Sequence, residues 1–166
     1  MRYHTDTAEL IRHCGRRAVE LGHSYVGSAH LLLALSETRG EAGMLIRSLG
    51  VEPGTAEVIT RLLYGSGRPG LPLPQGLSKN ARIILRDASH EAKQQGERTI
   101  RPVHVLMAMA RGEGCSAGTV MQIGGLPMDV LFTHTVEYVR REKRMPCQEK
   151  GEAEMKLLER FSEDLV

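Results

Sequence analysis

The sequence contains no tryptophan, and aromatic residues make up only 4% of its 166 residues. A core must therefore be filled by leucine, isoleucine, valine, alanine and methionine. These aliphatic side chains suit packed helices better than a β-sandwich, which uses many β-branched and aromatic residues. A chain of this length buries roughly two-thirds of its unfolded surface, so it needs no disulfide or metal for stability. The composition predicts a globular all-α protein.

An excess of charge of one sign is also missing. Lys and Arg together number 22 and Asp and Glu number 20, which gives a net charge of +2. A general nucleic-acid-binding protein carries a larger basic excess. The longest basic cluster, at residues 140–144, is short and is interrupted by Glu142. We therefore expect no nucleic acid as a partner.

Cysteine pairs and long apolar runs are absent as well. The three cysteines, Cys14, Cys115 and Cys147, are odd in number and widely spaced, so they form neither a disulfide framework nor a CxxC metal pair. No apolar run reaches the roughly 18 residues of a membrane span, and the first residues lack the apolar core of a signal peptide. These absences predict a cytoplasmic protein without a membrane segment.

An internal duplication organises the residues that are present. Residues 65–76 hold four Gly and three Pro, which interrupt any helix or strand, and they separate two stretches of similar length. At an offset of 74 residues the two stretches align without a gap, and the matches include the Gly and Pro that set helix ends. The identities are Arg12/Arg86, Ala18/Ala92, Gly22/Gly96, His30/His104, Leu32/Leu106, Ala34/Ala108, Gly40/Gly114, Gly50/Gly124 and Pro53/Pro127.

Each repeat is predicted to form four helices. In the first repeat, apolar residues recur at helical spacing up to Leu21, and Gly22 suits a left-handed C-terminal cap. Ser28 is expected to cap the second helix, and Gly40 precedes a short third helix. Pro53 is expected to begin a fourth helix, which carries the apolar residues Val58, Ile59, Leu62 and Leu63. No segment alternates with period two for long enough to predict a sheet.

The predicted architecture is therefore a tandem duplication of a four-helix repeat, with about eight helices related by a pseudo-two-fold axis. The first repeat is placed at residues 1–64, the Gly/Pro linker at 65–76 and the second repeat at 77–144. Residues 145–166 are expected to form a second linker and an amphipathic helix. Its apolar face consists of Met155, Leu158, Phe161 and Leu165. Because this face has no later domain to pack against, the chain is expected to be a fragment of a longer protein.

A family resemblance rests on residues 20–35 of the first repeat, ELGHSYVGSAHLLLAL, which precede a glycine-flanked short helix and the tripeptide at 49–51. The second repeat matches more loosely, through Gly96, Pro102 and the tripeptide at 104–106. This pattern resembles the N-terminal domain of the Clp AAA+ unfoldases of the ClpA/ClpC class, over roughly residues 3–140. The stretch at 158–165 is similar to the helix that begins the first ATPase domain of these proteins.

The resemblance implies a binding module that catalyses no reaction. In this family the domain docks adaptor proteins and protein substrates for a hexameric ATPase ring, which unfolds the substrates and feeds them to the ClpP protease. ATP and Mg²⁺ would be bound by downstream domains, because this chain lacks the GxxxxGK[ST] phosphate loop. The isolated chain is expected to be a monomer without a cofactor. The alternative is a stand-alone regulatory or decoy protein that competes for adaptors or ligands.

The candidate ligand- and substrate-binding residues lie where the second helix of each repeat begins. His30 and His104 occupy equivalent positions there. Each either contacts a ligand or satisfies a local backbone group and packs its repeat. We favour the second interpretation, because neither has an acidic residue or a cysteine at metal-ligand spacing. The full set of candidates is Ser28, Ala29, His30, Pro102, Val103 and His104.

One departure from the family affects ligand chemistry. In the ClpC branch, the residue before each repeated histidine is usually Glu, and these two carboxylates receive phosphorylated arginine on substrates. Here the matching positions are Ala29 and Val103, whose side chains accept no hydrogen bond. A carboxylate–guanidinium contact is strong because it is charge-assisted. We therefore expect phosphoarginine to bind more weakly than it does in those relatives.

Metal binding and cysteine chemistry are not expected. His13, Cys14 and His23 do not place three ligands within one or two helical turns, as tetrahedral zinc usually requires. Cys14 lies on the apolar stripe of the first helix and is predicted to be a core residue. Cys115 and Cys147 fall in predicted loops, and a reactive thiol at either position remains an open alternative.

The methionines are compatible with two interpretations, as part of an exposed peptide-binding surface or as part of the core. Met-rich surfaces bind varied peptides, yet Met107 and Met109 replace Leu33 and Leu35 of the first repeat, which predicts that these two lie in the core. For three others an exposed and a buried position are equally open: Met44, Met121 and Met128.

Overall fold

A computed structural model describes residues 2–65, 67, 76–112 and 115–144. Within this part the chain forms eight helices and one pair of two-residue strands, so the all-α prediction is confirmed. The first four helices are α1 (Thr5–Glu20), α2 (Ser28–Glu37), α3 (Glu41–Ser48) and α4 (Pro53–Tyr64). The next four are α5 (Lys79–Gln94), α6 (Pro102–Arg111), α7 (Ser116–Ile123) and α8 (Met128–Arg144). The strands are β1 (Arg2–Tyr3) and β2 (Thr99–Ile100).

The chain divides into two compact units, Met1–Thr135 and Val136–Val166. The first unit contains α1–α7 and the start of α8, and therefore both candidate helix starts. The linker predicted at 65–76 is described only at Gly65, Gly67 and Gly76, and the predicted segment at 145–166 lies outside the described residues. The repeat boundaries stay a prediction.

Contacts that occur twice relate the two repeats in the first unit. β1 pairs in parallel with β2, and Leu77 and Val26, at the equivalent positions, form a parallel bridge. The backbone N–H of His4 donates to the carbonyl of Ile100 at 3.0 Å, and the N–H of Ser78 donates to Val26 at 2.9 Å. Each repeat thus begins by pairing with the segment that precedes the second helix of the other repeat.

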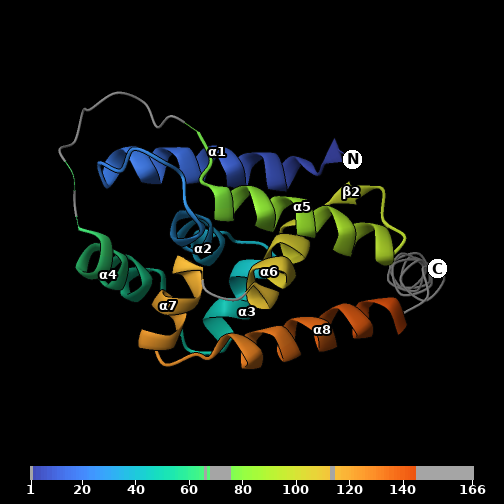
Figure 1. Ribbon diagram of the computed structural model, residues 1–166. Coiled ribbons are helices and arrows are strands. Elements are labelled where there is room, and N and C mark those ends of the chain that lie inside the picture. The colour runs from blue at the N-terminus through green and yellow to red at the C-terminus, as the bar shows by residue number, and fades with distance from the viewer. Residues whose placement is uncertain (1, 66, 68–75, 113–114, 145–166) are drawn as a thin grey trace, which may run out of the picture. The chain divides into compact units, whose positions relative to one another are not determined.

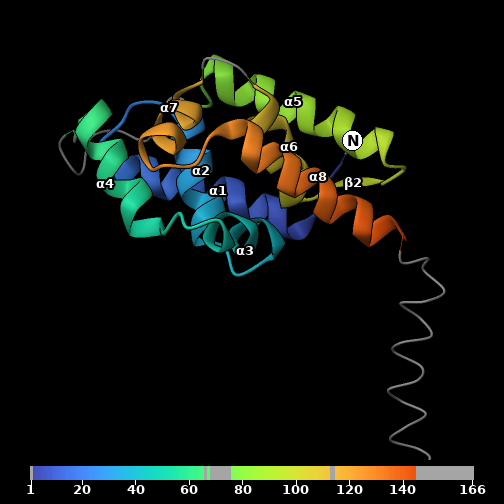
Figure 2. The same ribbon diagram turned by 90° about the horizontal axis from the view of Figure 1, so that it is seen from below.

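Helix packing shows the same symmetry, with contacts that recur between the equivalent helices of the two repeats. α2 packs against α7 as α6 packs against α3, and α1 contacts α6 as α5 contacts α2. α2 and α6 lie at the centre of these contacts (Figure 1), and Figure 2 shows α5 on one side of them and α3 on the other. The reciprocal contacts confirm the pseudo-two-fold arrangement of the duplicated helices within the first unit.

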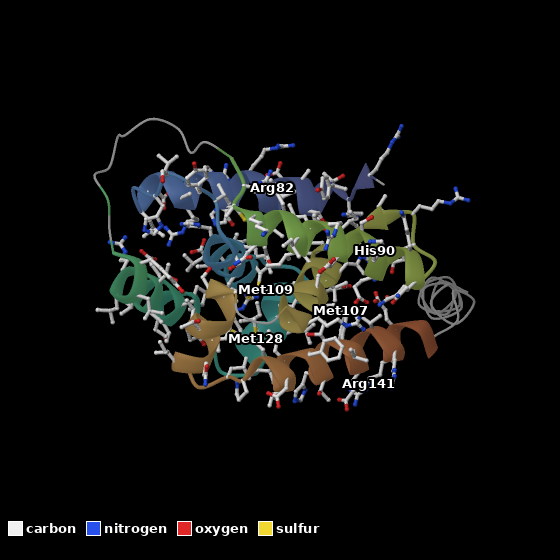
Figure 3. All side chains as sticks on the ribbon, in the orientation of Figure 1. Arg82, His90, Met107, Met109, Met128 and Arg141 are labelled. Carbon is white, nitrogen blue, oxygen red and sulfur yellow. The ribbon has the colours of Figure 1, made fainter. Side chains whose placement is uncertain are left out.

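The central helices have no solvent-facing side because both are surrounded. Residues 31–35 of α2 are fully buried, with 0% of their surface exposed. On α6, Met107 and Met109 lie among the surrounding helices (Figure 3) with 4% and 0% exposed, as the comparison with the first repeat predicts. For three methionines the sequence leaves both an exposed and a buried position open. Of these, Met121 is buried, Met128 is partly buried and Met44 is 54% exposed.

Glycine and proline set the helix ends where the sequence predicts them. Gly22 and Gly96 follow the ends of α1 and α5 with φ of 69° and 72°, in the left-handed region that glycine adopts without strain. Pro53 and Pro102 are the first residues of α4 and α6, where the missing N–H costs no helical hydrogen bond. These residues fix the points at which the chain leaves α1 and α5 and enters α4 and α6.

A largely buried arginine connects three helices of the first repeat. The side chain of Arg17 in α1 is only 11% exposed, and its Nε lies 3.2 Å from Glu37 of α2. Its Nη2 lies 2.6 Å from Glu57 of α4, and it also pairs with Glu20. The guanidinium holds the pKa of Glu57 below its usual value by hydrogen bonding and charge. This ion-pair cluster connects α1 to the last residue of α2 and to α4.

The outer side of α4 is more exposed than an ordinary core helix. Of the four apolar residues that mark this helix in the sequence, only Ile59 is buried. Val58 is 57% exposed, Leu62 80% and Leu63 41%.

In the described part of the chain, none of the helices has the length and apolar content needed to span a membrane.

Candidate functional site

The start of α2 places His30 against its own helix cap. Gly27 is the N-cap, and its backbone N–H donates to Nδ1 of His30 at 2.9 Å. The ring acts here as the Glu side chain does in a capping box. Ser28, Ala29 and His30 are all buried. The prediction that Ser28 caps α2 is wrong, because Gly27 holds the cap position and Ser28 is already helical.

The start of α6 repeats this arrangement. Arg101 is the N-cap, and its backbone N–H donates to Nδ1 of His104 at 2.9 Å. Pro102 is partly buried, and Val103 and His104 are buried. Both histidines therefore satisfy a backbone group at equivalent caps, as the favoured interpretation predicts.

A chain of hydrogen bonds leads from His30 to the end of α4. Because Nδ1 of His30 accepts from Gly27, the network assigns its proton to Nε2. This Nε2–H donates to Nδ1 of His23 at 2.7 Å. The Nε2–H of His23 in turn donates to the carbonyl of Gly65 at 2.8 Å. Burial, together with the nearby His23 and Arg17, lowers the pKa of His30 to about 4, so this ring is neutral at pH 7.

The surroundings of His104 are charged instead. Its Nε2 lies 3.7 Å from a carboxylate oxygen of Glu97. Arg101 donates to Glu97 at 2.7 and 2.8 Å and to Glu41 of α3 at 3.2 Å. Glu97 and Arg101 are equivalent to His23 and Gly27 of the first repeat by the 74-residue offset. The two helix starts therefore share one backbone geometry but differ in electrostatics.

Two serines exchange helix caps between α2 and α7. The hydroxyls of Ser28 and Ser116 lie 2.6 Å apart. The N–H of Ala29 donates to Ser116 at 3.2 Å, and the N–H of Ala117 donates to Ser28 at 3.1 Å. Each hydroxyl thus caps the other helix. Sequence reasoning missed this role of Ser28, because its partner is 88 residues away in the chain.

A cavity lies at each helix start. The α2-start cavity, of about 520 Å³, is bounded by the loop before α2, the start of α2 and the end of α4. The α6-start cavity, of about 870 Å³, is bounded by α1, the start of α3 and the start of α6. Both volumes are in the range of ligand pockets.

Four of the six predicted site residues line these cavities. Ala29 and His30 line the α2-start cavity, and Pro102 and Val103 line the α6-start cavity. Among the described lining residues, Ser28 and His104 do not occur. Sequence reasoning did not identify several other residues that line the cavities. The α2-start cavity also includes Tyr25, Thr60, Tyr64 and Ser116.

Two of the three cysteines lie among the described residues. Cys14 is fully buried in the core, as predicted, and burial raises the pKa of its thiol to about 12. Cys115 is the buried N-cap of α7, and Cys147 lies outside the described residues. His13 pairs with Glu37. Among residues 2–65, 67, 76–112 and 115–144, no group of three or more His, Cys, Asp or Glu could hold a metal ion.

Sequence comparison finds similarity to Clp chaperones. The chain is 28% identical over 131 residues to the chloroplastic chaperone protein ClpC of Pisum sativum, covering 78% of this chain and 14% of that protein. It is 30% identical over 118 residues to the ClpA homolog of Guillardia theta, an ATP-binding subunit of the ATP-dependent Clp protease, covering 70% of this chain and 14% of that protein. The chain thus spans about a seventh of the length of these relatives. No family model matches it.

The pea relative is chloroplastic, so the cytoplasmic location predicted from composition is not confirmed. Among solved structures, the N-terminal domain of ClpD from Arabidopsis thaliana superposes with a TM-score of 0.69 at 21% identity, over 83% of this chain and 97% of that one. The Hsp104 N-terminal domain from Candida albicans gives a TM-score of 0.67 at 19% identity, over 83% and 91%. The sequence is thus related to the ClpC and ClpA chaperones, and its helices adopt the fold of a Clp N-terminal domain.

Proposed function

We propose that this chain is the docking domain of a Clp-type ATPase, where adaptor proteins and protein substrates bind before unfolding. The observation that carries the proposal is a pair of cavities, of about 520 and 870 Å³, at equivalent helix starts of a Clp N-terminal fold. Peptide segments are the ligands that such paired concave sites on a rigid helical scaffold can receive. Delivery of the substrates to ClpP by the complete protein is part of the same proposal.

Two further similar structures support a peptide as the occupant. One is described as the N-terminal domain (1-163) of the ClpV1 ATPase from the E. coli EAEC Sci1 T6SS, with a TM-score of 0.59 at 18% identity over 90% of this chain and 86% of that one. The other is described as a peptide from the EAEC T6SS Sci1 SciI protein, with a TM-score of 0.57 at 20% identity, over 90% of each chain. Both descriptions name the same EAEC T6SS Sci1 system and the second names a peptide, which is the ground for proposing a peptide as the occupant.

The chain itself is proposed to be a non-enzymatic monomer without a cofactor. It lacks a GxxxxGK[ST] phosphate loop, so ATP and Mg²⁺ would be bound elsewhere in a longer, hexameric protein. A cytoplasmic location and the absence of nucleic acid as a partner belong to the same proposal, and rest on composition alone.

A binding assay with a permanently unfolded protein tests this function. Reduced, carboxymethylated α-lactalbumin is titrated with the purified chain, and binding is followed by fluorescence anisotropy. Ser24 and Gly40 line the two cavities, both are exposed, and a side chain at Gly40 would meet open space. We expect Ser24→Trp/Gly40→Trp to weaken binding by at least about tenfold, because the indoles fill the cavities.

The control is Gly54→Trp, which places the same side chain in open space on α4 away from both cavities. It should bind as the parent chain does. Absence of any binding by the parent chain, or equal binding by all three proteins, would refute the docking function. ATP turnover that copurifies with the chain would refute its non-enzymatic character.

A further inference from the structure

The two cavities differ in the charge of their walls. Among the described residues that line the α2-start cavity there is no Asp, Glu, Lys or Arg. The described walls of the α6-start cavity contain seven such residues, namely Asp6, Glu9, Arg16, Glu37, Arg39, Glu41 and Arg101. Six of the seven belong to α1 or to residues 37–41, and only Arg101 stands at a position whose equivalent, Gly27, lines the α2-start cavity.

Few polar groups in the α2-start cavity remain for a ligand. Both ring nitrogens of His23 and of His30 are used in the chain from Gly27 to Gly65. The hydroxyl of Ser116 accepts from Ala29 and bonds Ser28, and that of Thr60 donates to its own helix. A charged ligand group placed here would lose its hydration without gaining a partner of opposite charge.

Aromatic surface is concentrated at the same place. The sequence has only four Tyr and two Phe, and two of these six residues line the α2-start cavity. Tyr25 in the loop before α2 is 50% exposed, and Tyr64 at the end of α4 is 45% exposed. Half-exposed tyrosines are effective contact residues, because they offer large, rigid, apolar faces at a small cost in side-chain entropy.

The outer side of α4 adds apolar surface next to Tyr64. Val58, Leu62 and Leu63 are all exposed on this helix. The wall that α4 contributes is held in place by Glu57, which pairs with the buried Arg17. A segment of extended peptide leaving the cavity along α4 therefore meets apolar side chains, and the exposed cation among them, Arg61, is paired with Glu57.

We propose, on the basis of the docking function above, that the α2-start cavity binds an uncharged aromatic or large aliphatic side chain of an extended peptide, packed against Tyr25 and Tyr64. The α6-start cavity, with its mixed charges, does not share this preference. The two helix starts thus differ in the side chains that they bind, and the start of α2 selects apolar residues.

Fluorescein-labelled heptapeptides test this preference. Each has the sequence Gly-Gly-Ser-X-Ser-Gly-Gly, with Phe, Leu, Lys or Glu at X, and binding to the full chain is measured by anisotropy. We expect the Phe and Leu peptides to bind about ten- to a hundredfold more tightly than the Lys and Glu peptides. Tyr64→Ala and Tyr25→Ala should each weaken binding of the Phe peptide by about tenfold.

Two further variants complete the test. Tyr3→Ala removes a tyrosine of similar exposure, 43%, which does not line either cavity, and it should leave binding unchanged. His23→Glu introduces the acidic residue found at the equivalent position of the second repeat, and it should reverse the preference from Phe to Lys. Circular dichroism verifies that every variant is folded.

The outcomes separate this inference from the docking function. Equal affinity for all four peptides, or no effect of either tyrosine variant, overturns the inference while binding of unfolded α-lactalbumin leaves the docking function standing. Failure to bind both the peptides and the unfolded protein overturns both. Apolar selectivity that is lost in the Tyr25 and Tyr64 variants but kept in Tyr3→Ala supports the inference.

Discussion

Lowering the pH should destabilise this domain through one residue, His30. Its ring is buried and already accepts the N–H of Gly27 while donating to His23. A proton on Nδ1 would therefore face another N–H. Burial lowers the pKa of His30 from 6.5 to about 4. In the unfolded chain the ring binds a proton below pH 6.5, whereas in the folded domain it stays neutral until pH 4.

The sign and size of the effect follow from this difference. The unfolded state binds more protons between these two pKa values, so stability is complete above pH 6.5 and falls as the pH decreases toward 4. At pH 5 the loss due to His30 is about 2 kcal/mol, since each unit of difference corresponds to about 1.4 kcal/mol. Below pH 4 the loss no longer grows, because both states are protonated.

Urea unfolding at pH 7 and pH 5, followed by circular dichroism because the chain has no tryptophan, measures the loss. His30→Asn keeps an acceptor for Gly27 but cannot titrate, so it should lose about 2 kcal/mol less than the parent chain between the two pH values. His90→Asn changes an exposed histidine on α5 (Figure 3) and should match the parent. An identical loss in His30→Asn, or an NMR titration of His30 near pH 6.5, would refute the reasoning.

Three other perturbations have expected outcomes. Arg17→Met should lower the free energy of unfolding by about 2–3 kcal/mol in urea titrations, because it removes the cation shared by two partly buried carboxylates on α2 and α4, which then keep only His13 and Arg61 as partners. Gly67→Ala should cost about 1–3 kcal/mol by the same assay, because its Cβ would lie 2.0 Å from a backbone oxygen at the end of α1. In calorimetry, Ala29→Glu/Val103→Glu should bind free phosphoarginine more tightly than the parent chain, by about one to two decades at each site.

Matched controls accompany these tests. Arg12→Met removes an exposed pair with Glu9 and should change stability by less than about 0.5 kcal/mol. Gly54→Ala adds a Cβ that meets nothing within 4 Å and should be neutral or slightly stabilising. If the parent chain binds phosphoarginine at micromolar concentration and the two carboxylates do not improve it, the assignment of the helix starts as that site is wrong.

The sequence alone determined the repeat architecture, because its signals are local. Gly22 and Gly96 end helices through backbone freedom, and Pro53 and Pro102 begin them through a fixed φ. The continuous apolar run at 31–35 marks a helix without a solvent-facing side, and it is fully buried. The regular offset between the repeats also placed Met107 and Met109 in the core.

The candidate site could be located from the sequence but not built from it. The equivalence of His30 and His104 marked both helix starts, and their role as backbone acceptors was the favoured interpretation. The predicted role of Ser28 as the cap of its own helix was wrong. Whether its hydroxyl caps its own helix or a distant one depends on which helices pack together. Ser116, the partner that decides this, lies in the other repeat.

Only the tertiary structure decided the character of each cavity. Tyr64 and Tyr25 are 39 positions apart in the chain, and the folding of α4 beside the start of α2 brings both to one wall. In the same way, Arg101 reaches Glu41 because α3 packs against α6. Neighbouring residues determine where a helix ends, whereas the charge and shape of a cavity depend on side chains that meet only after long-range packing.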